Sequence, residues 1–289
     1  MNLSEFKAKK VLVTGHTGFK GSWLSLWLSI LGAEVIGFSD KLVSNPSHFE
    51  FVKNLVHYDL RGDIRSFDSI NKVITSHQPD YVFHLAAQPI VRTSYLEPLV
   101  TWDTNLFGTL NVLESLRNLK NQCCAVLITS DKCYDNLEWT WGYRENDKLG
   151  GPDPYSASKG AAELAINSYV KSFFSEKETN IRIASARAGN VIGGGDWAEN
   201  RIVPDCIKAW SKGEIVNLRY PNSTRPWQHV LEPLSGYLAL ALSLKSNSTL
   251  HGEPFNFGPI SAESKSVLNL VQEMSIYWNK VNWRTFAEN

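Results

Sequence analysis

The sequence has few sulfur-containing residues, with four cysteines and two methionines in 289 residues. The cysteines are Cys123, Cys124, Cys133 and Cys206. Their spacing matches no metal-ligand motif, and adjacent cysteines rarely pair with each other. We therefore expect free thiols in a reducing compartment, and no metal site.

Long apolar runs and an excess of either charge are also absent. No stretch reaches 18 apolar residues, so no membrane span is expected. Residues 1–10 are charged and lack the apolar stretch and cleavage site of a leader, which favours a cytoplasmic protein. Lys plus Arg and Asp plus Glu both number 29, so we expect neither nucleic acid nor a membrane surface as partner.

Short apolar strands alternate with helical patterns along the first two thirds of the chain. Strands are predicted at 10–14, 34–38, 81–85, 125–129 and 181–187, and helices at 22–31, 98–118, 154–175 and before residue 77. Asp153 and Pro154 are suited to begin the helix over 154–175. This alternation predicts a Rossmann-type, doubly wound parallel α/β sheet with ligands at the carboxyl ends of its strands.

The composition changes near residue 188, where Gly, Pro, Trp and Arg become frequent. We expect residues 1–187 to form the sheet domain and residues 188–289 a smaller, loop-rich substrate lobe. A helix over 233–245 and a strand over 255–257 are predicted within it, with some segments returning to the sheet.

A glycine-rich loop joins the first predicted strand to the first helix. It comprises Gly15, His16, Thr17, Gly18, Phe19, Lys20 and Gly21. Glycines in this place let the backbone approach a pyrophosphate, and the helix N-terminus supplies free N–H groups. The loop predicts a dinucleotide cofactor and makes residues 1–187 its binding domain; a tight turn without a ligand is the alternative.

An acid that binds ribose is expected about 20 residues after such a loop. Asp40 lies near that place and Ser39 occupies the usual position, so Asp40 is either the ribose ligand or a solvated turn residue. Asp63 and Ile64 are candidates to contact adenine. No arginine follows Asp40 directly, which favours NAD over NADP.

Tyr155 and Lys159 are four residues apart on a predicted helix and therefore share one face. A neighbouring ammonium lowers the pKa of a phenol, so Tyr155 is suited to take a proton from a sugar hydroxyl. Ser130, at the end of the preceding strand, can bond the same hydroxyl. An exposed helix pair is the alternative.

These motifs resemble the extended short-chain dehydrogenase/reductase superfamily. The resemblance also includes Leu85, Ala86, Ala87 and Gln88 after His84, together with Asn105. Residues 129–134 fall where its nucleotide-sugar 4,6-dehydratases carry an acid/base pair, usually Asp-Glu and here Asp131-Lys132. The sequence is similar to the branch of these dehydratases that acts on CDP-glucose, because of Asp131-Lys132 and the motifs at 15–23, 138–145, 193–197 and 224–230.

The resemblance implies tightly bound NAD and a reaction that is redox-neutral overall. Tyr155 would take the C4 hydroxyl proton, Lys132 the C5 proton, and Asp131 would protonate the departing C6 hydroxyl. The product, CDP-4-keto-6-deoxyglucose, would serve deoxysugar and O-antigen synthesis. A salt-bridged strand end is the alternative for Asp131 and Lys132.

The substrate diphosphate requires permanently charged donors. Asn190, Arg201, Arg219 and Arg225 are the candidates in the second lobe; surface ion pairs are the alternative for each arginine. Family members continue past the position of Asn289, so an incomplete lobe is expected. The helices at 98–118 and 154–175 are expected to pair two subunits, in a dimer or a tetramer.

Two other functions fit the same residues. Another nucleotide-sugar dehydratase or an epimerase would share the fold, and an epimerase has no need of the pair at 131–132. The second alternative is an NAD-binding protein without turnover.

Overall fold

A parallel sheet of seven strands forms the centre of the computed structural model, which describes residues 2–175, 180–259 and 265–285. Its strands, in spatial order, are β3 (Tyr58–Arg61), β2 (Glu34–Ser39), β1 (Lys10–Thr14), β4 (Tyr81–His84), β5 (Cys123–Ile128), β6 (Ile181–Ala188) and β11 (Pro254–Phe257). β1 pairs with both β2 and β4, so the winding reverses direction beside β1. A doubly wound sheet binds its ligands at this point.

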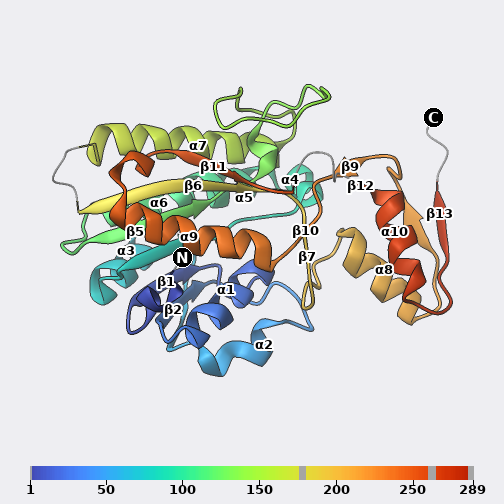
Figure 1. The fold of residues 1–289 in the computed structure, drawn as a ribbon, viewed down its shortest axis with the longest axis horizontal. Coiled ribbons are helices and arrows are strands. Elements are labelled where there is room, and N and C mark those ends of the chain that lie inside the picture. Colours follow the sequence, from blue (N-terminus) through green and yellow to red (C-terminus); the bar gives the residue numbers. More distant parts are fainter. Residues whose placement is uncertain (1, 176–179, 260–264, 286–289) are drawn as a thin grey trace.

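The helices cover both faces of the sheet (Figure 1). They are α1 (Phe19–Ile30), α2 (Phe49–Val52), α3 (Phe67–His77), α4 (Val91–Leu96), α5 (Pro98–Trp102), α6 (Gly108–Leu116), α7 (Pro154–Phe173) and α9 (Leu231–Ser246). α1 and α9 pack on one face, and α3, α6 and α7 pack on the other. The alternation of side chains along a strand explains this: Val11 and Val13 face the first core, and Leu12 faces the second.

The predicted fold class and the six predicted strands are confirmed, and two helices differ in detail. α1 begins at Phe19, three residues before the predicted start, because the glycine loop leads straight into its first turn. The predicted helix over 98–118 is interrupted by a π-helical turn at Asp103–Phe107. This turn contains Asn105, whose buried side chain bonds to two other segments. Such turns are frequent at functional sites.

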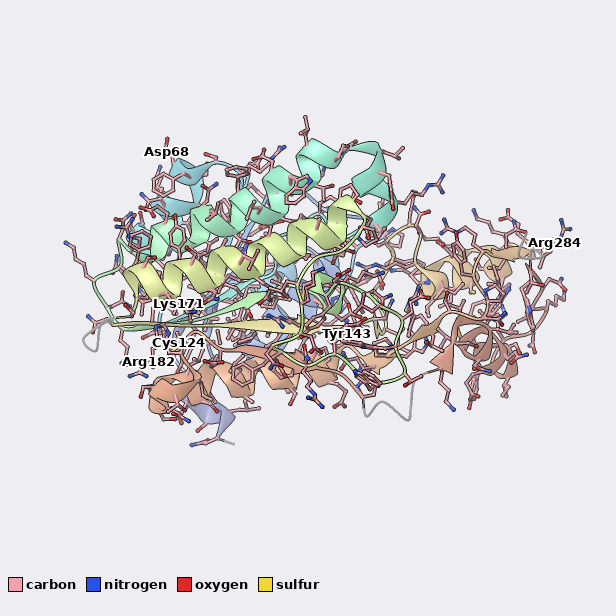
Figure 2. The ribbon with its side chains drawn as sticks, turned by 90° about the horizontal axis from the view of Figure 1, so that it is seen from above. Asp68, Cys124, Tyr143, Lys171, Arg182 and Arg284 are labelled. Atoms are coloured by element: carbon pink, nitrogen blue, oxygen red, sulfur yellow. The ribbon has the colours of Figure 1, made fainter. Side chains whose placement is uncertain are left out.

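A smaller lobe projects from the carboxyl end of the sheet (Figure 1). It contains α8 (Ile202–Ser211), α10 (Val267–Ile276) and the strand pairs β7–β10 (Val191–Ile192, Gln228–His229), β8–β13 (Val216–Leu218, Trp283–Thr285) and β9–β12 (Thr224–Arg225, Lys265–Ser266). Figure 2 shows Arg284 of β13 at the end of the molecule opposite Lys171 and Arg182.

The lobe is more regular than its composition predicted, because α8 and α10 enclose a small core of their own. Its buried members are Cys206, Trp210, Val216, Leu218 and Val271. Each helix has only ten residues, too few for its apolar spacing to stand out among the surrounding Gly, Pro and Trp. In contrast, α9 and β11 return to the sheet, where β11 pairs with β6.

The cysteines, the helices and the possible metal ligands can be examined among the residues that the structure describes. All four cysteines are free and buried. In the described ranges, no helix is long and apolar enough to cross a membrane, and no group of three or more His, Cys, Asp and Glu side chains is arranged to hold a metal ion.

Candidate active site

The turn between β1 and α1 is shaped to hold an anion. Gly15 has a φ of +71°, and a Cβ there would lie 2.7 Å from the backbone nitrogen of Ala86. A Cβ on Gly21 would lie 2.1 Å from the Gly15 carbonyl oxygen. Gly18 is the N-cap of α1 and provides no side chain for the first helical amides. These amides and the positive end of the helix dipole suit a phosphate, so the loop fits a dinucleotide.

Two side chains of this loop point into the protein. His16 is fully buried, and its Nε2 lies 2.9 Å from Oδ1 of Asp59. The Thr17 hydroxyl lies 2.8 Å from the Ser39 hydroxyl and donates to the Lys41 carbonyl at 2.7 Å. The side chains of His16 and Thr17 therefore brace the loop, which leaves their backbone for the predicted cofactor contact.

The side chain of Lys20 lies among the reaction groups. Its Nζ is 6.0 Å from the centre of the Tyr237 ring. The pKa of Lys20 is lowered to about 8, first by burial and then by the charge of Arg201, while the carboxyl of Asp131 opposes both effects. Lys20 was predicted as a cofactor residue, and its position also gives it influence over Asp131.

The candidates for the adenosine end lie after β2 and β3. Asp40 is exposed, and its Oδ1 accepts the Lys41 N–H at 2.7 Å. Asp63 forms an ion pair with Arg65 at 2.6 Å, and this pairing lowers the pKa of Asp63. Ile64 is buried in the core under α3 and α6. Asp40 thus remains a candidate for the ribose, whereas the Asp63 side chain already has a partner.

The segment after β4 is fixed by Asn105. Its Oδ1 accepts the Gln88 N–H at 2.8 Å, and its Nδ2 donates to the Gln88 carbonyl at 3.2 Å and to the Ser158 hydroxyl at 2.9 Å. Ser158 lies on α7, the helix of the Tyr–Lys pair. Asn105 therefore sets the position of residues 85–88 relative to that helix.

A short 3-10 turn, η4 (Asp131–Cys133), carries the predicted acid/base pair. Ser130 caps it by accepting the Lys132 N–H at 3.2 Å, and its hydroxyl donates to Oδ1 of Asp131 at 3.0 Å. A Cβ on Gly189 would lie 3.1 Å from Oδ2 of Asp131, so this carboxyl packs against the chain where it enters the lobe. Burial raises the pKa of Asp131, and the charge of Lys132 opposes this effect.

Tyr155 is held in the first turn of α7. Asp153 caps this helix and accepts the Ser156 N–H at 3.0 Å, as its sequence position predicted. The pKa of Tyr155 is raised to about 12. Burial is the main cause, hydrogen bonding with Ser130 opposes it, and the nearby Asp131 adds to the increase. The lowered pKa that the Tyr–Lys spacing predicted is therefore not the net effect, because loss of solvation is larger.

Lys159 is buried one turn after Tyr155, and its Nζ donates to the Ile128 carbonyl at 3.4 Å. Burial lowers its pKa to about 8 and the carboxylate of Glu163 opposes this effect. Glu163 pairs with Arg187 at 2.7 Å, with both side chains 3% exposed. Neither Glu163 nor Arg187 was predicted from the sequence. Tyr155, Lys159 and Glu163 follow one another at intervals of four residues, and this spacing was the sequence signal for Glu163.

Two of the predicted arginines act on the reaction groups. The charge of Arg201 lowers the pKa of Tyr155, and that of Arg225 lowers the pKa of Asp131. Arg201 also forms an ion pair with Asp196 at 2.9 Å. The structure thus brings Arg201 and Arg225 towards the place where substrate would react.

The other substrate candidates lie differently. The Asn190 carbonyl accepts the Gln228 N–H at 3.2 Å, which joins the lobe entry to β10. Arg219 is exposed after β8, and its charge acts on Asp205 of α8. Asp205 lies one turn after Arg201, whose carbonyl accepts the Asp205 N–H at 2.9 Å.

A cleft of about 590 Å³ opens between α4 and the lobe. Its lining residues are Arg92, Thr93 and Leu96 from α4, and Glu199, Asn200, Asp205 and Lys208 from the lobe. Arg92 donates to Oδ1 of Asn200 at 3.2 Å across it. A cleft of this size can admit a nucleotide.

Comparison with known proteins places this geometry among nucleotide-sugar enzymes. Residues 12–258 match the family model described as GDP-mannose 4,6 dehydratase. The chain is 47% identical to the CDP-glucose 4,6-dehydratase of Salmonella typhimurium, over 98% of this chain and 80% of the relative. It is 29% identical to the CDP-paratose 2-epimerase of Salmonella typhi, over 93% of this chain and 85% of that protein.

The fold is shared with solved structures at lower identity. One is a double mutant of DesIV, a dTDP-glucose 4,6-dehydratase from Streptomyces venezuelae with NAD and DAU bound. It superposes with a TM-score of 0.80 at 21% identity, covering 96% of this chain and 84% of that one.

Proposed function

The chain belongs to the GDP-mannose 4,6-dehydratase family, and from this membership we propose that it converts CDP-D-glucose to CDP-4-keto-6-deoxy-D-glucose with bound NAD. The observation that carries the proposal is the half-buried Asp131 carboxyl, which adjoins Lys132, accepts a hydrogen bond from Ser130 at 3.0 Å and acts on the Tyr155 hydroxyl. The choice of CDP follows the name of the relative that is 47% identical.

The residues present fit NAD. The amides at the start of α1 would hold the pyrophosphate, and Asp40 would hold the adenosine ribose. Residues 85–88 would hold the part of NAD that lies between the pyrophosphate and the Tyr–Lys pair. Bound NAD supplies a hydride acceptor for C4 and a hydride donor for C6 of the sugar. Because NAD would be returned to its oxidised form in each turnover, a site that retains the cofactor suits this reaction.

Tyr155 and Lys159 act on the C4 hydroxyl. Tyr155 takes the hydroxyl proton, and the Lys159 ammonium, fixed against the Ile128 carbonyl, favours the phenolate form. Ser130 adjoins both Tyr155 and Asp131, so it positions the hydroxyl between the two.

Asp131 and Lys132 eliminate water. The resulting C4 ketone acidifies the C5 proton, which Lys132 removes and later returns to C5. Asp131 protonates the C6 hydroxyl, which leaves as water. The burial that raises the pKa of Asp131 favours the protonated form that this step requires.

The lobe binds the nucleotide end of the substrate. Arg201 and Arg225 neutralise the diphosphate, and Asn190 contributes from the lobe entry. The cleft beside α4 takes the nucleoside. The charge of Arg219 acts on Asp205, which lines the same cleft.

Two subunits pair through the helices on the α7 side of the sheet. Exposed apolar side chains gather there on α5 and α7, among them Leu99 and Leu164, which are 82% and 60% exposed. A patch of this kind marks an interface. The free, buried cysteines suit the cytoplasm, where the product would enter deoxysugar synthesis for O-antigen.

The experiment is to incubate the purified protein with NAD and CDP-glucose, with dTDP-glucose in parallel, and to follow the alkali-induced absorbance of a 4-keto-6-deoxy sugar. We expect product from CDP-glucose. Asp131→Asn should lower kcat by roughly 10²- to 10⁴-fold, the usual contribution of a general acid. Asp135→Asn is the matched control, because Asp135 pairs with Lys148 at 2.8 Å outside the reaction centre.

Other results would change the assignment. Product from dTDP-glucose alone would keep the chemistry and correct the substrate. Absence of product from either sugar, with NAD bound, would identify a binding protein without turnover. Formation of an epimeric sugar nucleotide without any 4-keto-6-deoxy product, equally by wild type and by Asp131→Asn, would identify an epimerase.

A further inference from the structure

Three segments that are distant in the sequence meet at the first turn of α1. They are α1 itself, the loop between β2 and α2, and the Gly193–Asp196 turn of the lobe. The indole N–H of Trp23 donates to the Gly194 carbonyl at 2.9 Å. The Trp23 ring also stacks on His48, with ring centres 4.6 Å apart and an interplanar angle of 15°.

The loop residue His48 is fixed from the other side. Its Nδ1 lies 2.8 Å from the Ser22 hydroxyl, and that hydroxyl donates to the Phe19 carbonyl at 3.0 Å. Since the Ser22 proton is used in this way, His48 Nδ1 is the donor to Ser22. His48 thus connects the Trp23 ring to the beginning of α1.

The Gly193–Asp196 turn fits this surface closely. A Cβ on Gly195 would lie 2.6 Å from the His48 Cβ, and Gly195 has a φ of +85°, so a side chain is excluded on two grounds. A Cβ on Gly193 would lie 3.3 Å from the Phe19 ring. The turn therefore packs against the side chains of Phe19, Trp23 and His48, beside the helix end whose amides are suited to a pyrophosphate.

We propose that Trp23 and His48 clasp the Gly193–Asp196 turn over the N-terminus of α1, and that opening of this clasp limits the release of NAD. Trp23 is a positioning residue here, acting on the cofactor through the turn. The inference rests on the proposed function for the identity of the cofactor. An enzyme that regenerates its NAD in each turnover has no need to release the cofactor, which agrees with a lobe bound to the helix beside that cofactor.

The proposal is tested by stopped-flow release of NADH from the loaded protein into excess NAD, followed by NADH fluorescence. Trp23→Phe keeps an aromatic ring and loses the N–H donor. Loss of one hydrogen bond predicts release about fivefold faster. Gly195→Ala should accelerate release further, because its Cβ would displace the turn from His48.

Trp27→Phe is the matched control, one turn later on the same helix and packed on the sheet core. Thermal unfolding without NADH should be alike for Trp23→Phe and Trp27→Phe. Release that is unchanged in Trp23→Phe, or equally faster in both variants, would overturn the inference alone. A wild-type protein that binds no NADH would overturn the cofactor assignment as well.

Discussion

At the scale of single residues, burial decides how the site titrates. Lys20 and Lys159 both have their pKa lowered to about 8, and the pKa of Tyr155 rises to about 12, with loss of solvation as the largest cause in each case. Opposite charges such as Glu163 reduce these effects without reversing them. The site therefore keeps its ionised groups at a cost in stability.

Lys159→Met should make the protein more stable at pH 7, with loss of activity. The pKa of Lys159 falls from 10.5 to about 8 on folding, which costs up to about 3 kcal/mol while the side chain stays protonated in both states. The unfolded chain binds more protons between pH 8 and 10.5, so the cost falls as pH rises through that window.

Urea unfolding of both proteins across that pH range checks this. The advantage of Lys159→Met should be largest at pH 7 and fade towards pH 10.5. Lys171→Met, on an exposed position of the same helix (Figure 2), should show no such trend. An advantage of Lys159→Met that stays constant with pH would contradict the assigned cause.

At the scale of elements, α7 and η4 bring the reacting groups together. Each begins with a side-chain cap, Asp153 for α7 and Ser130 for η4, that fixes its first turn. Tyr155 lies in the first turn of α7 and Asp131 in η4. The caps therefore determine how the Tyr–Lys pair meets the acid/base pair.

Asp153→Ala should lower the free energy of unfolding by about 1 kcal/mol, the usual effect of losing a helix cap. It should also lower kcat, because the turn that carries Tyr155 loosens. Asp153→Asn retains a cap oxygen for the Ser156 N–H and should remain close to wild type in both respects. Urea unfolding and the dehydratase assay measure the two effects; equal losses in both variants would point to the charge of Asp153 instead.

At the scale of the whole molecule, the lobe is joined to the sheet unit by a few specific contacts. Trp23 and Gly194 are one such pair, and Arg92 and Asn200 are another. The outer surface of α7 and its neighbouring helices makes no such contact among the described residues, and the leucines on that surface are exposed. In the proposed dimer, a second subunit covers them.

Leu99→Glu should convert the protein to a monomer, because it places a charge at the centre of the proposed interface, where Leu99 is 82% exposed. Ile30→Glu, 73% exposed at the end of α1, is the control and should leave the assembly unchanged. Sedimentation velocity distinguishes the two species. A wild-type protein that already sediments as a monomer would refute the pairing.

Features that depend on neighbours in the chain could be predicted from the sequence. The strand–helix alternation, the glycine loop, the cap at Asp153, the Tyr155–Lys159 spacing and the Asp131-Lys132 pair all follow from residue order, because backbone geometry is local. The resemblance to the dehydratases depended on those same motifs.

The tertiary structure decided what depends on burial and on distant contacts. It set the direction of the Tyr155 pKa, buried Glu163 against Arg187, and brought the charge of Arg219 to Asp205. It also brought Trp23 to Gly194, 171 residues away in the chain. Solvation and long-range contacts arise only when the chain has folded, so no local pattern in the sequence could specify them.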